Sequence, residues 1–170
     1  MSWLDVDIRP HLLWAEGEVV VDEVRHHRVA YVRPAAEAAV GLAVLVSMLF
    51  LPPGLGWVLL TISAAVLAHA AWLGARERRD VFVVTNMRVF RVHGVLSTTL
   101  ATMPLTRILD ITVQKPLLGR LRGYGHFVFE SAAHAPGLRD IRFVARPDQR
   151  DLTIQRVVQR AGLRGPVDVN

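Results

Sequence analysis

The pattern of apolar and polar positions divides the chain into two very different parts. Between positions 33 and 76 the only charged residue is Glu37, and two apolar blocks fill this stretch, at residues 35–51 and 55–74. At 1.5 Å per residue these blocks predict helices of roughly 25 and 30 Å, about the thickness of the hydrocarbon core of a bilayer. The Pro-Pro-Gly sequence at residues 52–54 cannot continue a helix and predicts a tight turn. The pattern therefore predicts a transmembrane helical hairpin.

After residue 80 the pattern changes to short runs of β-branched and aromatic residues separated by turn residues. Phe127 and Phe129, for example, alternate with polar neighbours, which is typical of a half-buried strand. Asn86 is expected to adopt the strained turn conformation between the first two strands. We expect six strands, at residues 81–84, 88–92, 95–103, 108–114, 125–131 and 139–145. Residues 18–32 also have an extended pattern and are expected to add a strand from before the hairpin.

The last predicted element is an amphipathic helix. Asp148 is the expected N-cap and Gly162 is placed to end the helix. Its apolar face has the i, i+3, i+4, i+7 spacing at Ile154, Val157, Val158 and Ala161. The predicted fold class is an α+β membrane protein, with a small antiparallel β-barrel or sandwich capped by a C-terminal α-helix. The predicted parts are an N-terminal segment (1–33), the hairpin (34–75), the β-rich domain (76–162) and a C-terminal tail (163–170).

Charge is distributed unevenly and predicts the orientation in the membrane. Residues 76–170 carry sixteen Lys and Arg against eight Asp and Glu, whereas residues 1–33 carry four arginines against six acids. Arginines lie on both sides of the hairpin and the turn between the helices has no charge, so the positive-inside rule predicts that both termini are cytoplasmic. We expect a location in the plasma or bacterial inner membrane. The absence of cysteine agrees with a reducing compartment.

Several polar and small residues of the hairpin allow two interpretations. Glu37 lies one turn after Arg33 and is expected to pair with it at the membrane boundary, rather than to form an ion or proton site. His69 either packs, with a hydrogen bond across the hairpin, or faces a partner. Small residues of the second helix provide surfaces for close helix contact, within the hairpin or with another protein: Ala64, Ala68 and Ala71, or Ala65 with Gly74.

Three ordered segments resemble a bacterial pleckstrin-homology (PH) family whose members carry two transmembrane helices before the PH-like domain. The segments are Phe82-Val83-Val84-Thr85-Asn86-Met87-Arg88, Met103-Pro104-Leu105 leading to Ile108-Leu109-Asp110-Ile111, and Leu118-Gly119-Arg120-Leu121-Arg122-Gly123-Tyr124-Gly125. The resemblance implies a PH-like β-barrel capped by a C-terminal helix, and it brings no catalytic residues. Many PH domains bind phosphoinositides through a dense basic run in the first hairpin. This chain has only Arg88 and Arg91 there.

The most suggestive surface is the loop at residues 115–124, where basic and apolar residues alternate. In one interpretation the loop contacts lipid: its cations meet headgroup phosphates and its leucines enter the interface. In the other the loop is a structural crossover whose leucines plug the barrel, with glycines permitting its turns. The candidate lipid-contact residues, which include three juxtamembrane arginines, are Arg76, Arg78, Arg79, Lys115, Leu117, Leu118, Arg120, Leu121 and Arg122.

The sequence shows no constellation that indicates catalysis, a metal site or a cofactor. The adjacent His26 and His27 would point to opposite faces of a strand and could not readily share a metal ion. Asp110 and Glu130 are expected to be solvated rather than paired in a cleft. Nucleic-acid binding is not expected, because the strands offer no aromatic platform.

The leading hypothesis is a non-enzymatic, membrane-anchored PH-like module. It would bind proteins as a scaffold or as an accessory subunit of a membrane complex, with a membrane-protein partner or a second copy of itself. The alternative hypothesis is recognition of anionic lipid headgroups at the cytoplasmic surface.

Overall fold

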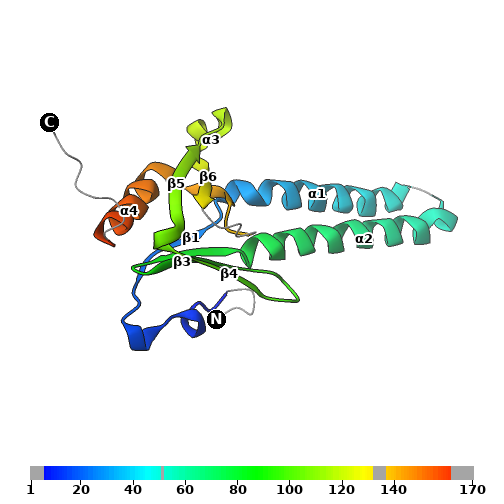
Figure 1. Cartoon of the computed structure of the whole chain (residues 1–170). Helices are drawn as coiled ribbons and strands as arrows, with labels where there is room; N and C mark the ends of the chain where they lie inside the picture. Colours follow the sequence, from blue (N-terminus) through cyan, green and yellow to red (C-terminus); the bar gives the residue numbers. More distant parts are fainter. Residues whose placement is uncertain (1–5, 51, 132–136, 162–170) are drawn as a thin grey trace. The chain divides into compact units, whose positions relative to one another are not determined.

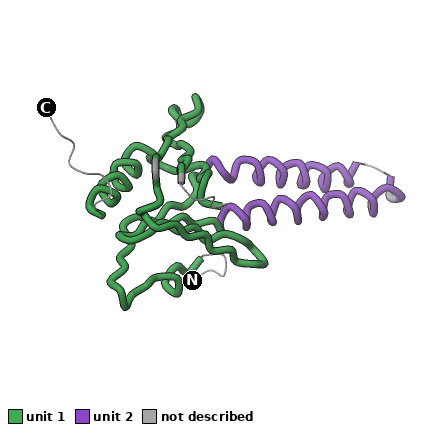
Figure 2. Tube along the Cα trace, viewed as in Figure 1, with its two compact units in different colours: residues 1–27, 79–170 green, residues 28–78 purple. Residues whose placement is uncertain are grey.

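A computed structural model describes residues 6–50, 52–131 and 137–161 of the chain (Figure 1). The chain forms two compact units (Figure 2). Residues 28–78 form the helical hairpin. Residues 1–27 and 79–170 belong to the second unit, which is called the domain below. The hairpin is therefore inserted into the chain of the domain.

The hairpin consists of two long antiparallel helices. A 3-10 turn (Arg28–Tyr31) leads into α1 (Val32–Ser47), a second 3-10 turn (Met48–Phe50) ends it, and α2 follows (Pro53–Arg78). The segments 28–50 and 54–78 are long and apolar enough to cross a membrane, and only 11% of each apolar window is buried. A core helix of a soluble protein would be mostly buried. Both helices agree with the predicted blocks, and α2 extends at both ends beyond residues 55–74.

The two helices pack closely at Gly41 of α1. A Cβ atom there would lie 2.9 Å from the Leu67 side chain, which would then have to shift. The buried Ser63 hydroxyl donates to the Gly41 carbonyl oxygen at 2.9 Å. The predicted small residues Ala64, Ala68 and Ala71 are exposed instead. They belong to a face of α2 that α1 leaves uncovered.

The domain is built from two antiparallel sheets. The first has the order β1-β2-β3-β4, with β1 (Val20–Arg25), β2 (Val81–Thr85), β3 (Arg88–His93) and β4 (Thr99–Pro104). The second has the order β5-β6-β7, with β5 (Ile108–Gln114), β6 (Tyr124–Ser131) and β7 (Asp140–Ala145). The helix α4 (Pro147–Arg160) follows, and its apolar face completes the core. The predicted α+β fold with a C-terminal capping helix is confirmed.

The main core joins both sheets to α4. Phe82 of β2 contacts Phe129 of β6 with ring centroids 5.4 Å apart, and Ile154 of α4 is fully buried in the same cluster. A second cluster lies on the opposite face of the first sheet, where Leu12 of the N-terminal segment covers Val83 and Phe90. Both faces of β2 are therefore covered. This explains why every residue of β2 is buried and why its sequence is continuously apolar rather than alternating.

The strand expected from before the hairpin is confirmed as β1. It pairs with β2, and Arg25 lies opposite Val81 at the end of the ladder where the chain leaves for the hairpin and returns from it. Beyond this end, His26 forms an isolated bridge with Val144 of β7, which ties the two sheets together. The segment before the hairpin thus contributes a strand to the first sheet and a bridge to the second.

Three local expectations were wrong, each for a physical reason. Asn86 has no positive φ; its side-chain amide instead binds the backbone of Gly17 and Val19. Arg146, not Asp148, is the N-cap of α4, because Pro147 lacks an N–H and occupies the first helical turn. Residues 115–123 were expected to form a loop, but they contain the short helix α3 (Leu117–Arg122). The predicted end at Gly162 lies outside the described residues.

Two further segments differ in extent. The third predicted strand, residues 95–103, is reduced to β4, because Gly94, with φ +119°, begins a tight turn in which a side chain would collide with the Ser97 carbonyl at 1.9 Å. The extended pattern of residues 18–32 holds only for β1; the chain then turns helical from Arg28.

Candidate functional site

The helix α3 projects from the crossover between β5 and β6 and presents its leucines outward. Leu117, Leu118 and Leu121 are 79%, 63% and 83% exposed. The interpretation in which these leucines plug the barrel is therefore wrong. Gly119 is the buried residue of α3, and a side chain there would meet the Tyr124 carbonyl at 2.4 Å. The helix rests on the domain through this glycine.

The arginines of α3 flank its leucines. Successive residues of a helix are about 100° apart around its axis, so the three leucines lie within an arc of roughly 100° on one side of α3. Arg120 lies beside one edge of this arc and Arg122 beside the other. Both arginines are exposed, and among the described residues neither has an ion-pair partner. Lys115 differs, because its ammonium pairs with the carboxylate of Asp148 in the first turn of α4.

A cluster of aromatic rings lies directly behind α3. Tyr124, which follows the C-cap Gly123, stacks on His27 with ring centroids 5.8 Å apart and contacts Phe143 at 5.6 Å. The His27 amide donates to the Phe143 carbonyl oxygen at 2.6 Å. Since His27 is the last residue of the domain before the hairpin, this cluster places α3 at the end of the domain where the chain enters the hairpin.

His126 belongs to the same cluster, and the pKa of its imidazole is shifted. Burial lowers the pKa of its imidazole below the ordinary 6.5, and the positive charge of Arg142 lowers it further. In the neutral ring, Nδ1 accepts a hydrogen bond from the Phe143 amide at 3.1 Å. Phe143 has a φ of 55°, a strained conformation for a bulky residue, and this bond helps to hold it.

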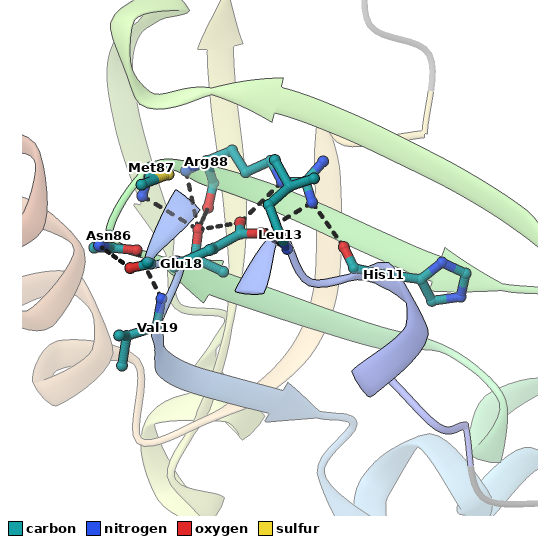
Figure 3. Close-up of polar contacts among 9 residues, drawn as sticks. His11, Leu13, Glu18, Val19, Asn86, Met87 and Arg88 are labelled. Atoms are coloured by element: carbon teal, nitrogen blue, oxygen red, sulfur yellow. Dashed lines mark hydrogen bonds and ion pairs between the residues drawn. The ribbon is translucent and has the colours of Figure 1, made fainter. Parts of the chain in front are cut away.

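Arg88, on the β2–β3 hairpin, has a different environment (Figure 3). Arg88 donates to both carboxylate oxygens of Glu18, at 2.9 and 3.0 Å, and to the His11 carbonyl at 2.7 Å. The Thr85 hydroxyl donates to the same carboxylate at 2.8 Å, and the Leu13 amide at 2.7 Å. Glu18 is only 1% exposed. Burial raises the pKa of Glu18, but the hydrogen bonds from Arg88, Leu13 and Thr85 outweigh it and hold the pKa below the ordinary 4.5.

Arg91 is engaged as fully as Arg88. Its guanidinium binds both oxygens of Asp80, at 2.7 and 2.6 Å, and the Gly137 carbonyl at 2.8 Å. His26 lies 3.7 Å from the same carboxylate. Both arginines that could have served a phosphoinositide site are therefore occupied by carboxylates of the domain. Neither pairing was predicted. Glu18 and Arg88 are 70 residues apart, so no local spacing connects them.

The other candidate residues are distributed over both units. Arg76 and Arg78 end α2 and are exposed. Arg79 belongs to the domain and donates to the Val95 carbonyl oxygen at 2.8 Å. Asp110 and Glu130 lie opposite each other in the β5–β6 ladder and are both exposed. Within the described residues, no three His, Asp or Glu side chains gather in a way that could hold a metal ion.

Comparison with protein families resolves the fold. A model of the bacterial PH domain matches residues 27–161, most of the chain. The chain belongs to the bacterial PH domain family. The two antiparallel sheets, of four and three strands, and the closing helix α4 agree with this assignment. The matched residues include the inserted hairpin. The strand β1 precedes the matched residues, so this chain completes its PH-domain sheet with a strand from outside them. No curated protein and no solved structure gave a significant match.

In the hairpin, Glu37 links the two helices of the PH-domain protein. Its carboxylate accepts a hydrogen bond from Arg33 at 3.2 Å, as expected, and lies 2.7 Å from Nδ1 of His69 on α2. The predicted cross-hairpin hydrogen bond of His69 is therefore present. These three side chains form a polar contact between the two helices, in addition to the hydrogen bond from Ser63 to Gly41.

Proposed function

We propose that this PH domain is a non-enzymatic binding module, anchored by its hairpin in the plasma or bacterial inner membrane with both termini in the cytoplasm. We propose further that it acts there as an accessory subunit or scaffold for another membrane protein. The observation that carries the proposal is the exposed face of small residues on α2.

The face formed by Ala64, Ala68 and Ala71 is well suited to a third helix. The residues repeat at i, i+4 and i+7, and α1 does not cover them. In a membrane, small residues let helix backbones approach closely, and close packing is a principal source of helix association there. Trp57 and Trp72, which flank this face along α2, are also exposed. Lipid chains would fill such a face less well than a helix of a partner.

The state of the first-hairpin arginines supports a protein ligand over a phosphoinositide. Arg88 would have to leave the buried carboxylate of Glu18, and Arg91 the partly buried carboxylate of Asp80, before either could bind a phosphate. A permanently anchored domain also needs no headgroup affinity to reach the membrane. The binding surface of the domain can therefore serve to recognise a partner protein.

Affinity purification of the tagged full-length chain from its native membranes in mild detergent, followed by mass spectrometry, tests this proposal. We expect a co-purifying membrane protein at near-stoichiometric amount, or a second copy of the chain detected by crosslinking. Ala68→Leu should reduce this recovery strongly, because the added side chain separates the helix backbones. The matched control is Ala39→Leu on the exposed side of α1, which should leave recovery unchanged. A chain that is always monomeric and without a partner would refute the proposal.

A further inference from the structure

We infer that the apolar face of α3 inserts into the surface of an anionic lipid bilayer beside the hairpin, as a second membrane contact of the domain. The inference rests on the proposed membrane anchoring, and it concerns a different surface from the proposed partner face on α2. The occupant is the bilayer itself rather than a specific headgroup.

The leucines of α3 are exposed. Three leucines on a six-residue helix are all more than 60% exposed, although most large apolar side chains of the strands in the same domain are buried in two clusters. The contact through Gly119 holds the helix with these leucines directed away from the domain. Transfer of an apolar face with this orientation out of water is favourable.

The charge of α3 is complementary to an anionic surface. Arg120 and Arg122 border the leucine face, and α3 carries no acidic residue. A guanidinium on a long apolar stem can hold its head at the phosphate level while the stem lies along the apolar face. Near an anionic surface each such residue strengthens binding. Leucines flanked by two arginines therefore fit an anionic interface better than a purely apolar protein surface.

The helix α3 lies near the chain crossing into the hairpin. Stacking of Tyr124 on His27 places α3 next to the point where the chain leaves for α1. The returning chain enters the domain at Arg79, whose guanidinium binds the Val95 carbonyl. The next residue, Leu96, is 88% exposed. Exposed leucines of the domain thus lie close to both points at which its chain continues into the hairpin.

The absence of cysteine from the sequence permits a clean test. Single-cysteine variants of the full-length chain are labelled with an environment-sensitive fluorophore and placed in nanodiscs of phosphatidylcholine and phosphatidylglycerol with doxyl-labelled lipid. Leu118→Cys reports on α3, and Ile62→Cys, in the middle of α2, reports on the hairpin. Met87→Cys is the control, since it is exposed at the β2–β3 turn, at the end of β2 opposite to Val81.

We expect shallow doxyl groups to quench most of the emission of the Leu118 label, and deep ones to quench the Ile62 label. The Met87 label should lose little. If the Leu118 label behaves like the Met87 label while the Ile62 label is quenched, the inference is wrong and the anchoring stands. If the Ile62 label is not quenched, both fail. Protection of the Leu118 label in native membranes but not in lipid nanodiscs would assign α3 to a protein partner and overturn the inference.

Discussion

Two pairs of arginines in this PH domain have opposite environments. Arg88 and Arg91, on the first hairpin, are bound by the carboxylates of Glu18 and Asp80 and by backbone carbonyls. Arg120 and Arg122, on α3, are exposed beside exposed leucines. The first pair holds the N-terminal segment and the strands together, whereas the second pair is presented to the surroundings. The fold thus uses the positive charge of the first pair internally and leaves that of the second pair exposed.

The largest effect on folding is expected at the buried pair. Arg88→Ala leaves the Glu18 carboxylate buried without its cation, and breaking a buried ion pair in this way costs about 3 kcal/mol. Hydrogen exchange of strands β2 and β3 in the full-length chain measures the loss of protection. The control is Arg120→Ala, which should leave exchange in these strands unchanged. Equal exchange in both variants would mean that the two pairs of arginines do not differ in the way described.

Sequence patterns predicted the parts of this molecule that depend on local spacing. The apolar blocks gave both helices of the hairpin, and alternation at Phe127 and Phe129 gave β6. The pairing of Glu18 with Arg88 could not be predicted, since it depends on the N-terminal segment folding over the first sheet. For the leucines of α3 the sequence left both interpretations open and favoured the one in which they plug the barrel. Only the buried Gly119 decides which way they face.

The next largest effect is expected at that glycine. Gly119→Ala would place a methyl group 2.4 Å from the Tyr124 carbonyl and 3.0 Å from Pro116, so α3 would have to move away from its present position. Overpacking of this kind costs about 1–3 kcal/mol. Thermal unfolding of the domain should therefore begin at a lower temperature. Gly54→Ala is the matched control, because its methyl group meets nothing within 4 Å. Equal unfolding temperatures would show that α3 is not held through Gly119.

A smaller, pH-dependent effect is expected behind α3. The pKa of His126 is lower in the folded domain than its ordinary 6.5. The stabilisation from the neutral ring is therefore complete above about pH 6.5 and is lost as pH falls through the lower folded pKa. Thermal unfolding between pH 7.5 and 5 should show a steeper decrease for the unmodified chain than for His126→Gln, whose amide oxygen still accepts a hydrogen bond. Parallel decreases would contradict the role of His126.

The smallest effect on folding is expected for the two exposed arginines of α3. Arg120→Gln with Arg122→Gln should leave unfolding unchanged and weaken the contact with anionic lipid by about 2 kcal/mol in total. The measurement is quenching of a Leu118 label in nanodiscs of increasing phosphatidylglycerol content. Arg156→Gln with Arg160→Gln removes the same charge from the exposed face of α4 and should have no effect on the label. Equal quenching in both double variants would show that the arginines of α3 do not contribute.

Hydrogen exchange of the unmodified full-length chain in two kinds of nanodisc tests the contrast between the arginine pairs most directly. One kind contains phosphatidylglycerol and the other only phosphatidylcholine. The account predicts that amides of residues 117–123 exchange more slowly in the anionic discs, whereas amides of residues 85–88 exchange at the same rate in both. Identical exchange at α3 in the two discs, or slower exchange confined to the first hairpin in the anionic discs, would contradict it.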